Sequence, residues 1–340
     1  MRWIACELHT HTAHSDGRQS LPELAAGAAA LGFECIALTD HNTMSGLAQR
    51  EEVERETGIR ILPGMEWTTF YGHMVTIGAR AFVDWREAHP QRITEGAAEV
   101  HRHGGVAGLA HPYRIGSPAC TGCYWEYEIA DWSDLDYIEV WSGTWAPIKT
   151  DNLRAYALWT ERLNAGTRIA ATSGRDWHAQ EETDEPLSVT YLGLEDERTP
   201  FEDEAVRALR RGRVSVTIGP LLTLEASQGG RTYGIGDVLV RSAEETGEPI
   251  EVGVSLQFSA REGRWSLPPQ TFSLRLVGDG GILAERAVDA VDGGYRLETP
   301  AGGTTWLRAE LWGVVRGARA LIAFTNAIYY ETGEKGARTP

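Results

Sequence analysis

Short apolar runs alternate with amphipathic segments from residue 4 to about residue 195 of this 340-residue chain. This alternation is typical of parallel β/α units, in which a helix after each strand returns the chain to the same edge of the sheet. Strands are expected near 4–9, 34–39, 60–66, 106–110, 136–141, 168–172 and 187–192, with an extra strand at 72–78, and helices near 20–31, 46–57, 91–103, 151–165 and 202–212. Seven repeats favour a closed or nearly closed, TIM-like β/α barrel, whose active site would lie at the carboxyl ends of its strands.

The sequence changes character after residues 215–220. Helical periodicity disappears, and alternating apolar runs such as 251–258 and 271–277 are separated by glycine-rich turns. This pattern is typical of an all-β sandwich. We therefore expect an α/β domain over residues 1–218 and a C-terminal β-sandwich domain over residues 219–340. The second domain has no histidine, so the chemistry is expected in the first.

The formal net charge of −16 argues against a duplex nucleic-acid partner, because binding to the phosphate backbone depends on clustered lysine and arginine. A mononucleotide or short oligonucleotide held by metal ions is still compatible with this charge. The first strand begins close to residue 1 without a signal-peptide pattern, and no apolar run reaches the roughly 18 residues of a membrane span. We expect a soluble, cytoplasmic protein that acts on a small molecule, with no membrane partner.

Potential metal ligands gather where the expected strands end. His9 and His11 lie two residues apart in the first strand, and the strand period of two places both imidazoles on one face. Asp16 follows in a Ser-Asp-Gly turn that can fold back toward them. The ends of later strands add His41, Glu66, His111, Asp176 and His178. Because strand ends meet at one rim of a barrel, these side chains are expected to converge.

Imidazole and carboxylate ligands without cysteine suit divalent zinc, manganese or iron. The candidates are too many for one ion, and a carboxylate such as Glu66 can bridge two, so a multinuclear centre is expected. Such a centre generates a metal-bound hydroxide near neutral pH and clamps the attacking and leaving oxygens, which favours hydrolysis. Redox and NTP-dependent chemistry are disfavoured, because the chain has no flavin, nicotinamide or P-loop motif.

These motifs resemble the PHP (polymerase and histidinol phosphatase) family of metal-dependent hydrolases. The resemblance spans residues 1 to about 215 and includes His73 besides the strand ends above. It implies a distorted seven-stranded β/α barrel with up to three divalent metal ions at its mouth. By this resemblance, one metal would be held by His9, His11, Glu66 and Asp176, a second by Glu66, His73 and His111, and a third by Asp16, His41 and His178. Segments 159–166, 211–220 and 324–330 are similar to the carbaryl-hydrolase-like branch, whose members carry a C-terminal β domain.

Three residues near these ligands are candidates for a catalytic role. Arg114 either binds a phosphate as a bidentate donor or forms an ordinary ion pair. Arg175 stands where the family usually has a small residue, and it either contacts an anionic substrate or pairs with a nearby acid. Asp40, next to His41, either shuttles a proton or makes a hydrogen bond that orients the site.

The expected function is metal-dependent hydrolysis of a phosphoester in a small phosphorylated metabolite or nucleotide. The alternative is hydrolysis of a carbamate, ester or amide at the same centre. Tryptophans at the strand ends, Trp67, Trp141 and Trp177, either pack in the core or offer an apolar wall to a nucleobase or aryl group. A second alternative is a metal-binding regulatory protein without turnover. The β domain could pack on the barrel, shape the pocket entrance or form a homo-oligomer contact.

Overall fold

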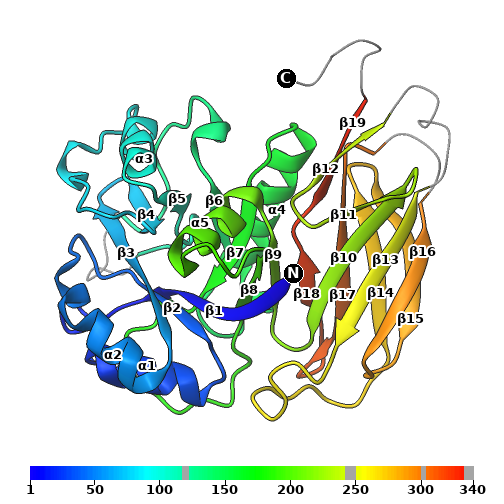
Figure 1. Cartoon of the computed structure of the whole chain (residues 1–340), viewed down its shortest axis with the longest axis horizontal. Coiled ribbons are helices and arrows are strands. Elements are labelled where there is room, and N and C mark those ends of the chain that lie inside the picture. Colours follow the sequence, from blue (N-terminus) through cyan, green and yellow to red (C-terminus); the bar gives the residue numbers. More distant parts are fainter. Residues whose placement is uncertain (117–121, 242–249, 300–303, 333–340) are drawn as a thin grey trace.

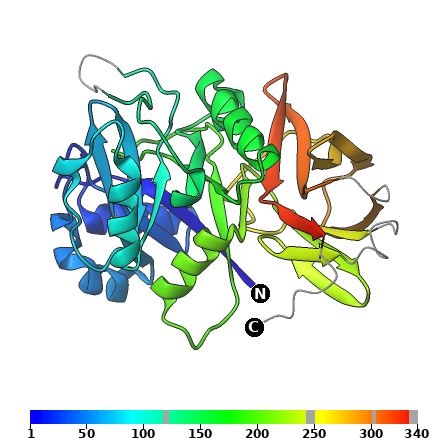
Figure 2. The same ribbon diagram turned by 90° about the horizontal axis from the view of Figure 1, so that it is seen from above.

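The computed structural model describes residues 1–116, 122–241, 250–299 and 304–332. The α/β part lies at one end of the molecule and the later strands at the other (Figures 1 and 2). The strands of the α/β part are β1 (Arg2–Thr10), β2 (Cys35–Leu38), β3 (Arg60–Thr69), β4 (Gly72–Ile77), β5 (Val106–Leu109), β6 (Tyr137–Ser142), β7 (Ala170–Gly174) and β8 (Val189–Leu194). Its helices are α1 (Leu21–Ala30), α2 (Arg50–Thr57), α3 (Ile93–Arg102), α4 (Thr150–Asn164) and α5 (Phe201–Arg211), with short 3₁₀ helices η1 (Ser45–Gln49), η2 (Trp85–Glu87), η3 (Trp132–Asp134) and η4 (Ala146–Ile148). Every strand and helix expected in this part is present, with ends shifted by a few residues.

Seven strands of this part pair in the order β1-β2-β3-β4-β5-β6-β7. Neighbours are parallel, except that β4 is antiparallel to both β3 and β5. Between β7 and β1 the described residues form one bridge, from Thr10 to Trp177, flanked by backbone hydrogen bonds of 2.9 and 3.0 Å. These pairings do not establish a closed barrel. They do bring the segment after β7 to the end of β1, where the candidate ligands begin.

Strand β8 departs from the run of parallel strands that the repeat pattern predicts. It pairs antiparallel with β1 on the side away from β2, with Thr190 opposite Cys6. Residues 175–188 contain no helix that could carry the chain back to its starting edge, so β8 runs opposite to β1. β8 then pairs with β9 (Val214–Thr217), and β9 pairs with β18 (Ala318–Thr325), so one sheet continues into the C-terminal part.

The C-terminal part is rich in sheet, as predicted. Its other strands are β10 (Leu221–Gln228), β11 (Arg231–Gly234), β12 (Val238–Arg241), β13 (Glu251–Gln257), β14 (Phe272–Gly278), β15 (Gly281–Val288), β16 (Gly293–Glu298), β17 (Trp306–Val315) and β19 (Ile328–Thr332). Four of them form a separate antiparallel sheet in the order β11-β10-β13-β16. Apolar side chains of this sheet and of β14, β17 and β18 belong to one buried cluster. The sandwich assignment and the domain boundary at 218/219 stay predictions.

Helix α1 begins directly after the loop that carries Asp16. The hydroxyl of Ser20 accepts a hydrogen bond from the Glu23 N–H, and the Glu23 carboxylate accepts one from the Ser20 N–H at 2.7 Å. This capping box fixes where the helix starts. The side-chain amide of Gln19 donates to the carbonyls of His11 and Trp177 at 3.0 Å each, which holds the loop against both strand ends. Within the described ranges, no helix has the length and apolarity to cross a membrane.

Candidate metal centre

The structure brings all nine candidate ligands together in three groups that share members. Within each group the potential ligand atoms lie within 4.8 Å of one another. The groups are His9, His11, Glu66 and Asp176; Glu66, His73 and His111; and His11, Asp16, His41 and His178. The first two match the sets implied by the family resemblance, and the third adds His11. That these residues hold metal ions remains a prediction.

His9 in β1 and His11 just after its end lie on the same face, because alternate side chains of an extended segment point the same way. His9 and His11 are both fully buried. The Nε2 of His11 lies 3.0 Å from Oδ1 of Asp176, and the Nε2 of His9 lies 3.4 Å from the same oxygen. Asp176 has a φ of 54°, a left-handed conformation that is uncommon outside glycine. Such backbone strain concentrates at functional sites, and here it aims the carboxylate at the two imidazoles.

Glu66 lies where the first two groups meet. Its Oε2 is 3.0 Å from Nε2 of His9, while its Oε1 is 2.8 Å from Nδ1 of His73 and 3.1 Å from Nε2 of His111. The β3–β4 hairpin brings His73 back to this point, since it lies opposite Thr68 in the antiparallel register. The two oxygens thus face different groups, which is the arrangement that a carboxylate needs to bridge two metal ions.

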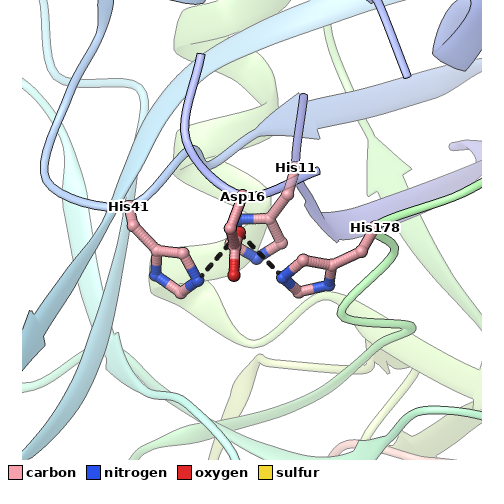
Figure 3. Close-up of side chains that lie close together, drawn as sticks. All are labelled: His11, Asp16, His41 and His178. Atoms are coloured by element: carbon pink, nitrogen blue, oxygen red, sulfur yellow. Dashed lines mark ion pairs between the residues drawn. The ribbon is translucent and has the colours of Figure 1, made fainter. Parts of the chain in front are cut away.

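The third group is the most open to solvent. Figure 3 shows Asp16 between His41 and His178, with His11 close by. The Oδ1 of Asp16 lies 3.0 Å from Nε2 of His178 and 3.4 Å from Nε2 of His41. The Asp16 side chain is 59% exposed, whereas Glu66 at the heart of the other groups is fully buried. A ligand that enters from solvent therefore meets this group directly.

The charges of the centre keep its buried carboxylates ionised. Burial alone would raise the pKa of Glu66, but the charge of His9 and hydrogen bonds from neighbouring imidazoles outweigh burial and hold this pKa well below its usual range. Burial would likewise raise the pKa of Asp176, and His9 and His11 bring it well below the usual value. Both groups are therefore anionic at neutral pH, as metal ligands must be.

Many polar atoms of this centre are buried without a hydrogen-bond partner in the part of the chain that the structure describes. They include Nε2 of His9, both ring nitrogens of His11, Oε2 of Glu66, Nε2 of His73, Nδ1 of His111 and Oδ1 of Asp176. Unpaired buried polar atoms are costly. Imidazole nitrogens and carboxylate oxygens that converge in this way suit divalent zinc, manganese or iron, so the residues fit the metal ions that the sequence predicts.

Sequence reasoning misses one acidic residue of the site, Glu139 of β6. Its Oε2 lies 2.7 Å from Nδ1 of His9, and both side chains are buried. When the Nδ1–H group of neutral His9 donates a hydrogen bond to Glu139, Nε2 is left with a free lone pair for a metal ion. A glutamate among the apolar residues of the expected strand 136–141 is the signal that could have revealed it.

Asp40 organises the loop after β1. Its Oδ1 accepts hydrogen bonds from the Thr12 N–H at 2.7 Å and the Ser15 hydroxyl at 2.6 Å, and its Oδ2 accepts one from the Thr12 hydroxyl at 2.7 Å. The carboxylate is buried. These contacts favour the orienting role of Asp40 over that of a proton shuttle.

The two candidate arginines lie in different places. Nη1 of Arg114 is 2.5 Å from Oδ2 of Asp176, and Nη2 donates to the Ser142 hydroxyl at 2.7 Å, so Arg114 lies at the edge of the centre. The guanidinium of Arg175 lies 4.5 Å from the ring centre of Trp177, beside a cavity lined by α1 and residues 180–184. None of the nine candidate ligands lines that cavity.

The strand-end tryptophans pack in the core. Trp67, Trp141 and Trp177 are 1%, 1% and 3% exposed. They leave little surface for a nucleobase or an aryl group.

Comparison with known families places a recognised domain in the first part of the chain. Residues 7–111 match the family model of the PHP domain. This range contains every candidate ligand except Asp176 and His178. The family resemblance is confirmed for this range, whereas the likeness to the carbaryl-hydrolase-like branch stays a prediction.

Similar proteins cover different shares of the chain. It is 28% identical over 151 residues to an uncharacterized protein of Methanocaldococcus jannaschii, which covers 41% of this chain and 82% of that protein. It is 32% identical over 105 residues to the 3′,5′-nucleoside bisphosphate phosphatase of Chromobacterium violaceum, over 30% of this chain and 37% of that enzyme. A two-domain protein from Bacteroides vulgatus, described as containing a predicted PHP-like metal-dependent phosphoesterase, matches with a TM-score of 0.53 and 15% identity over 96% of this chain and 95% of that one. At this identity the structural likeness concerns the fold alone.

Proposed function

We propose that this chain, whose residues 7–111 match the PHP domain, is a metal-dependent phosphoesterase acting on a small phosphorylated metabolite or nucleotide. The observation that carries the proposal is the convergence of nine ligand-type side chains in three groups, joined through Glu66 and His11. The partial match to a nucleoside bisphosphate phosphatase supports phosphoester chemistry over other hydrolyses.

In this proposal the three groups hold two or three divalent ions of manganese, zinc or iron. Such ions lower the pKa of bound water and neutralise the oxygens of a phosphoryl group. Glu66, whose two oxygens face different imidazoles, would help to hold the ions, and Glu139 would hold the His9 ring in the orientation that presents Nε2. Arg114 keeps N–H donors beyond those it gives to Asp176 and Ser142, and these can hydrogen-bond a phosphoryl oxygen at the edge of the centre.

The test is phosphate release from nucleotides and sugar phosphates by protein reconstituted with manganese, zinc or iron(II). We expect metal-dependent release by the wild-type protein and its loss in Asp176→Asn, which removes a carboxylate from the buried group. The matched control is Asp84→Asn, because the Asp84 side chain is 52% exposed in a loop and pairs with Arg86. This control should release phosphate at the wild-type rate.

Metal content measured on the same samples distinguishes protein that is inactive because it lacks metal from protein that binds metal but does not cleave phosphoesters. If protein that carries its metal ions releases no phosphate from any phosphoester, the phosphoesterase assignment is overturned. Aryl carbamates and carboxylic esters would then be tested with the same variants. Protein that binds metal but cleaves none of these bonds would point to a regulatory role.

A further inference from the structure

Lys149 is an unusual residue beside the candidate metal centre. It is one of two lysines in the sequence, among 32 basic residues. It lies between η4 and α4, half-buried, with its Nζ 3.5 Å from the carbonyl oxygen of Ser142. No carboxylate of the described residues forms an ion pair with this ammonium group, although many surface arginines here have such a partner.

The loop that holds Lys149 does not depend on this lysine. The carbonyl of Ser142 already accepts a hydrogen bond of 3.1 Å from the side-chain amide of Asn152, which also donates to the Ala146 carbonyl at 3.0 Å. Asn152 accepts from the Ser142 N–H at 3.1 Å as well, and it is buried. Asn152 therefore fixes the loop, and the Lys149 ammonium keeps N–H donors free for a ligand.

A second cation lies next to Lys149. Gly143 has a φ of 73°, and a side chain there would come within 2.6 Å of Nζ of Lys149 and 3.7 Å of Nη2 of Arg114. Burial and the charge of Arg114 lower the pKa of Lys149, and the carboxylates of Asp151, Glu185 and Asp176 offset part of this effect. Two neighbouring cations in a partly buried position favour the binding of an anion between them.

The position of Arg114 indicates which anion this is. Its Nη1 contacts Asp176 of the centre, and its Nη2 contacts Ser142 on the side where Lys149 lies. Arg114 forms an ion pair with the Asp176 carboxylate, whereas among the described residues no ion pair joins Lys149 to that carboxylate. A group bound by Lys149 is therefore a neighbour of the group at the ligand cluster and not the same group.

We propose that Lys149 and Arg114 bind a second phosphate of the substrate, next to the phosphate that is hydrolysed. This inference rests on the proposed function, because it takes the metal ions as the site of the reacting phosphate. The substrate class is then a small molecule with two phosphate groups. Lysine and arginine are both suited to phosphate, the first as a point charge and the second through planar paired donors.

The first test compares adenosine 3′,5′-bisphosphate with adenosine 5′-monophosphate on the metal-reconstituted enzyme. Lys149→Met should lower kcat/KM for the bisphosphate by about 10- to 100-fold, the loss expected for one charge-assisted hydrogen bond, and by less than about threefold for the monophosphate. Lys149→Arg should recover much of the loss. Arg198→Met, which removes one charge from a side chain that is 92% exposed, is the matched control and should act as wild type. Equal losses on both substrates, or none, would overturn the proposal.

The second test needs no turnover. Wild-type protein with its metal ions is treated with an amine-directed acylating reagent, and labelling of Lys149 is followed by peptide mapping, with Lys335 as the internal reference. Adenosine 3′,5′-bisphosphate should slow labelling of Lys149 more than the monophosphate does, and leave Lys335 unchanged. If the bisphosphate protects Lys149 from labelling but no phosphoester is hydrolysed, the anion site is supported and the proposed function is overturned. If phosphoesters are hydrolysed but Lys149 is not protected, the proposed function is supported and the anion site is overturned.

Discussion

Glu139 and His9 lie 130 residues apart in the sequence, yet Oε2 of Glu139 is 2.7 Å from Nδ1 of His9. Both side chains are buried. The contact joins β6 to β1 across the interior and leaves Nε2 of His9 facing the other ligands. The carboxylate therefore determines which nitrogen of the histidine is available to a metal ion.

Replacing Glu139 should weaken metal binding. Glu139→Ala removes the acceptor that orients His9, and metal affinity should fall by about 10- to 100-fold, as for other carboxylates that support a metal-binding histidine. Glu139→Gln keeps a neutral oxygen acceptor, so its metal affinity should fall less than that of Glu139→Ala. Isothermal titration calorimetry measures the metal affinity of both variants, with manganese or zinc added to protein from which a chelator has removed the metal. Equal affinity in the wild type and Glu139→Ala would show that His9 needs no such support.

Metal removal should proceed in two stages. The group around Asp16 is open to solvent, while Glu66, His73 and His111 are buried, so a limited amount of chelator should first remove the ion held by Asp16. Metal analysis per chain over time should show one fast and one slow fraction. Asp16→Asn should lack the fast fraction. Uniform loss of all ions would contradict this assignment.

Glu7 should make the stability of the chelated protein depend on pH. Burial raises the pKa of Glu7 from 4.5 to about 7, although N–H groups of Arg175 and His9 donate to its Oε1. Below pH 4.5 both the folded and unfolded forms are protonated, and there is no penalty. As pH rises from 4.5 through 7, the folded form must give up a proton that it holds more tightly than the unfolded chain, so stability falls by about 3 kcal/mol.

Urea unfolding at pH 5 and pH 8 measures this effect as a difference between variants. Glu7→Gln keeps Oε1 as acceptor and removes the titration, so it should stabilise the protein more at pH 8 than at pH 5. Glu161→Gln, at a side chain that is 67% exposed on α4, serves as control and should show no such difference. The same change in both variants would refute the prediction.

Arg308 and Glu310 of β17 should tie the C-terminal strands to helix α4. Nε of Arg308 donates to Oε1 of Glu310 at 2.9 Å, and its Nη1 donates to the hydroxyl of Thr160 at 2.9 Å. The Tyr156 hydroxyl donates to the same Glu310 oxygen at 2.8 Å. Arg308→Met leaves a buried carboxylate without its cation and should reduce the free energy of unfolding by about 3–5 kcal/mol.

The double variant tests whether the unpaired charge causes this loss. Arg308→Met with Glu310→Leu removes both charges and should be more stable than Arg308→Met alone, since no buried ion is left uncompensated. Urea denaturation of the wild type, both single variants and the double variant gives the coupling. Simple additivity of the two changes would mean that the pair does not act as a unit.

The sequence by itself determined the strands and helices of the α/β part and the residue types at the strand ends. Periodicity and capping are local, so β1, β3 and α1 could be located from nearby residues. The extra strand at 72–78 was also predicted, and the structure pairs it with β3 as a hairpin between neighbouring segments. The ligand types were visible as histidines and acids in apolar surroundings. Their metal ions, and the branch of the family, remain predictions.

The tertiary structure alone decided how distant segments meet. The antiparallel pairing of β8 with β1 depends on the path of residues 175–188, which no local pattern encodes. The contact of Glu139 with His9 and the placement of Lys149 beside Arg114 need β6 and the loop after it to pack near β1 and β5. Such contacts form between residues far apart in the chain, and their specificity comes from packing and burial, which no short window of sequence contains.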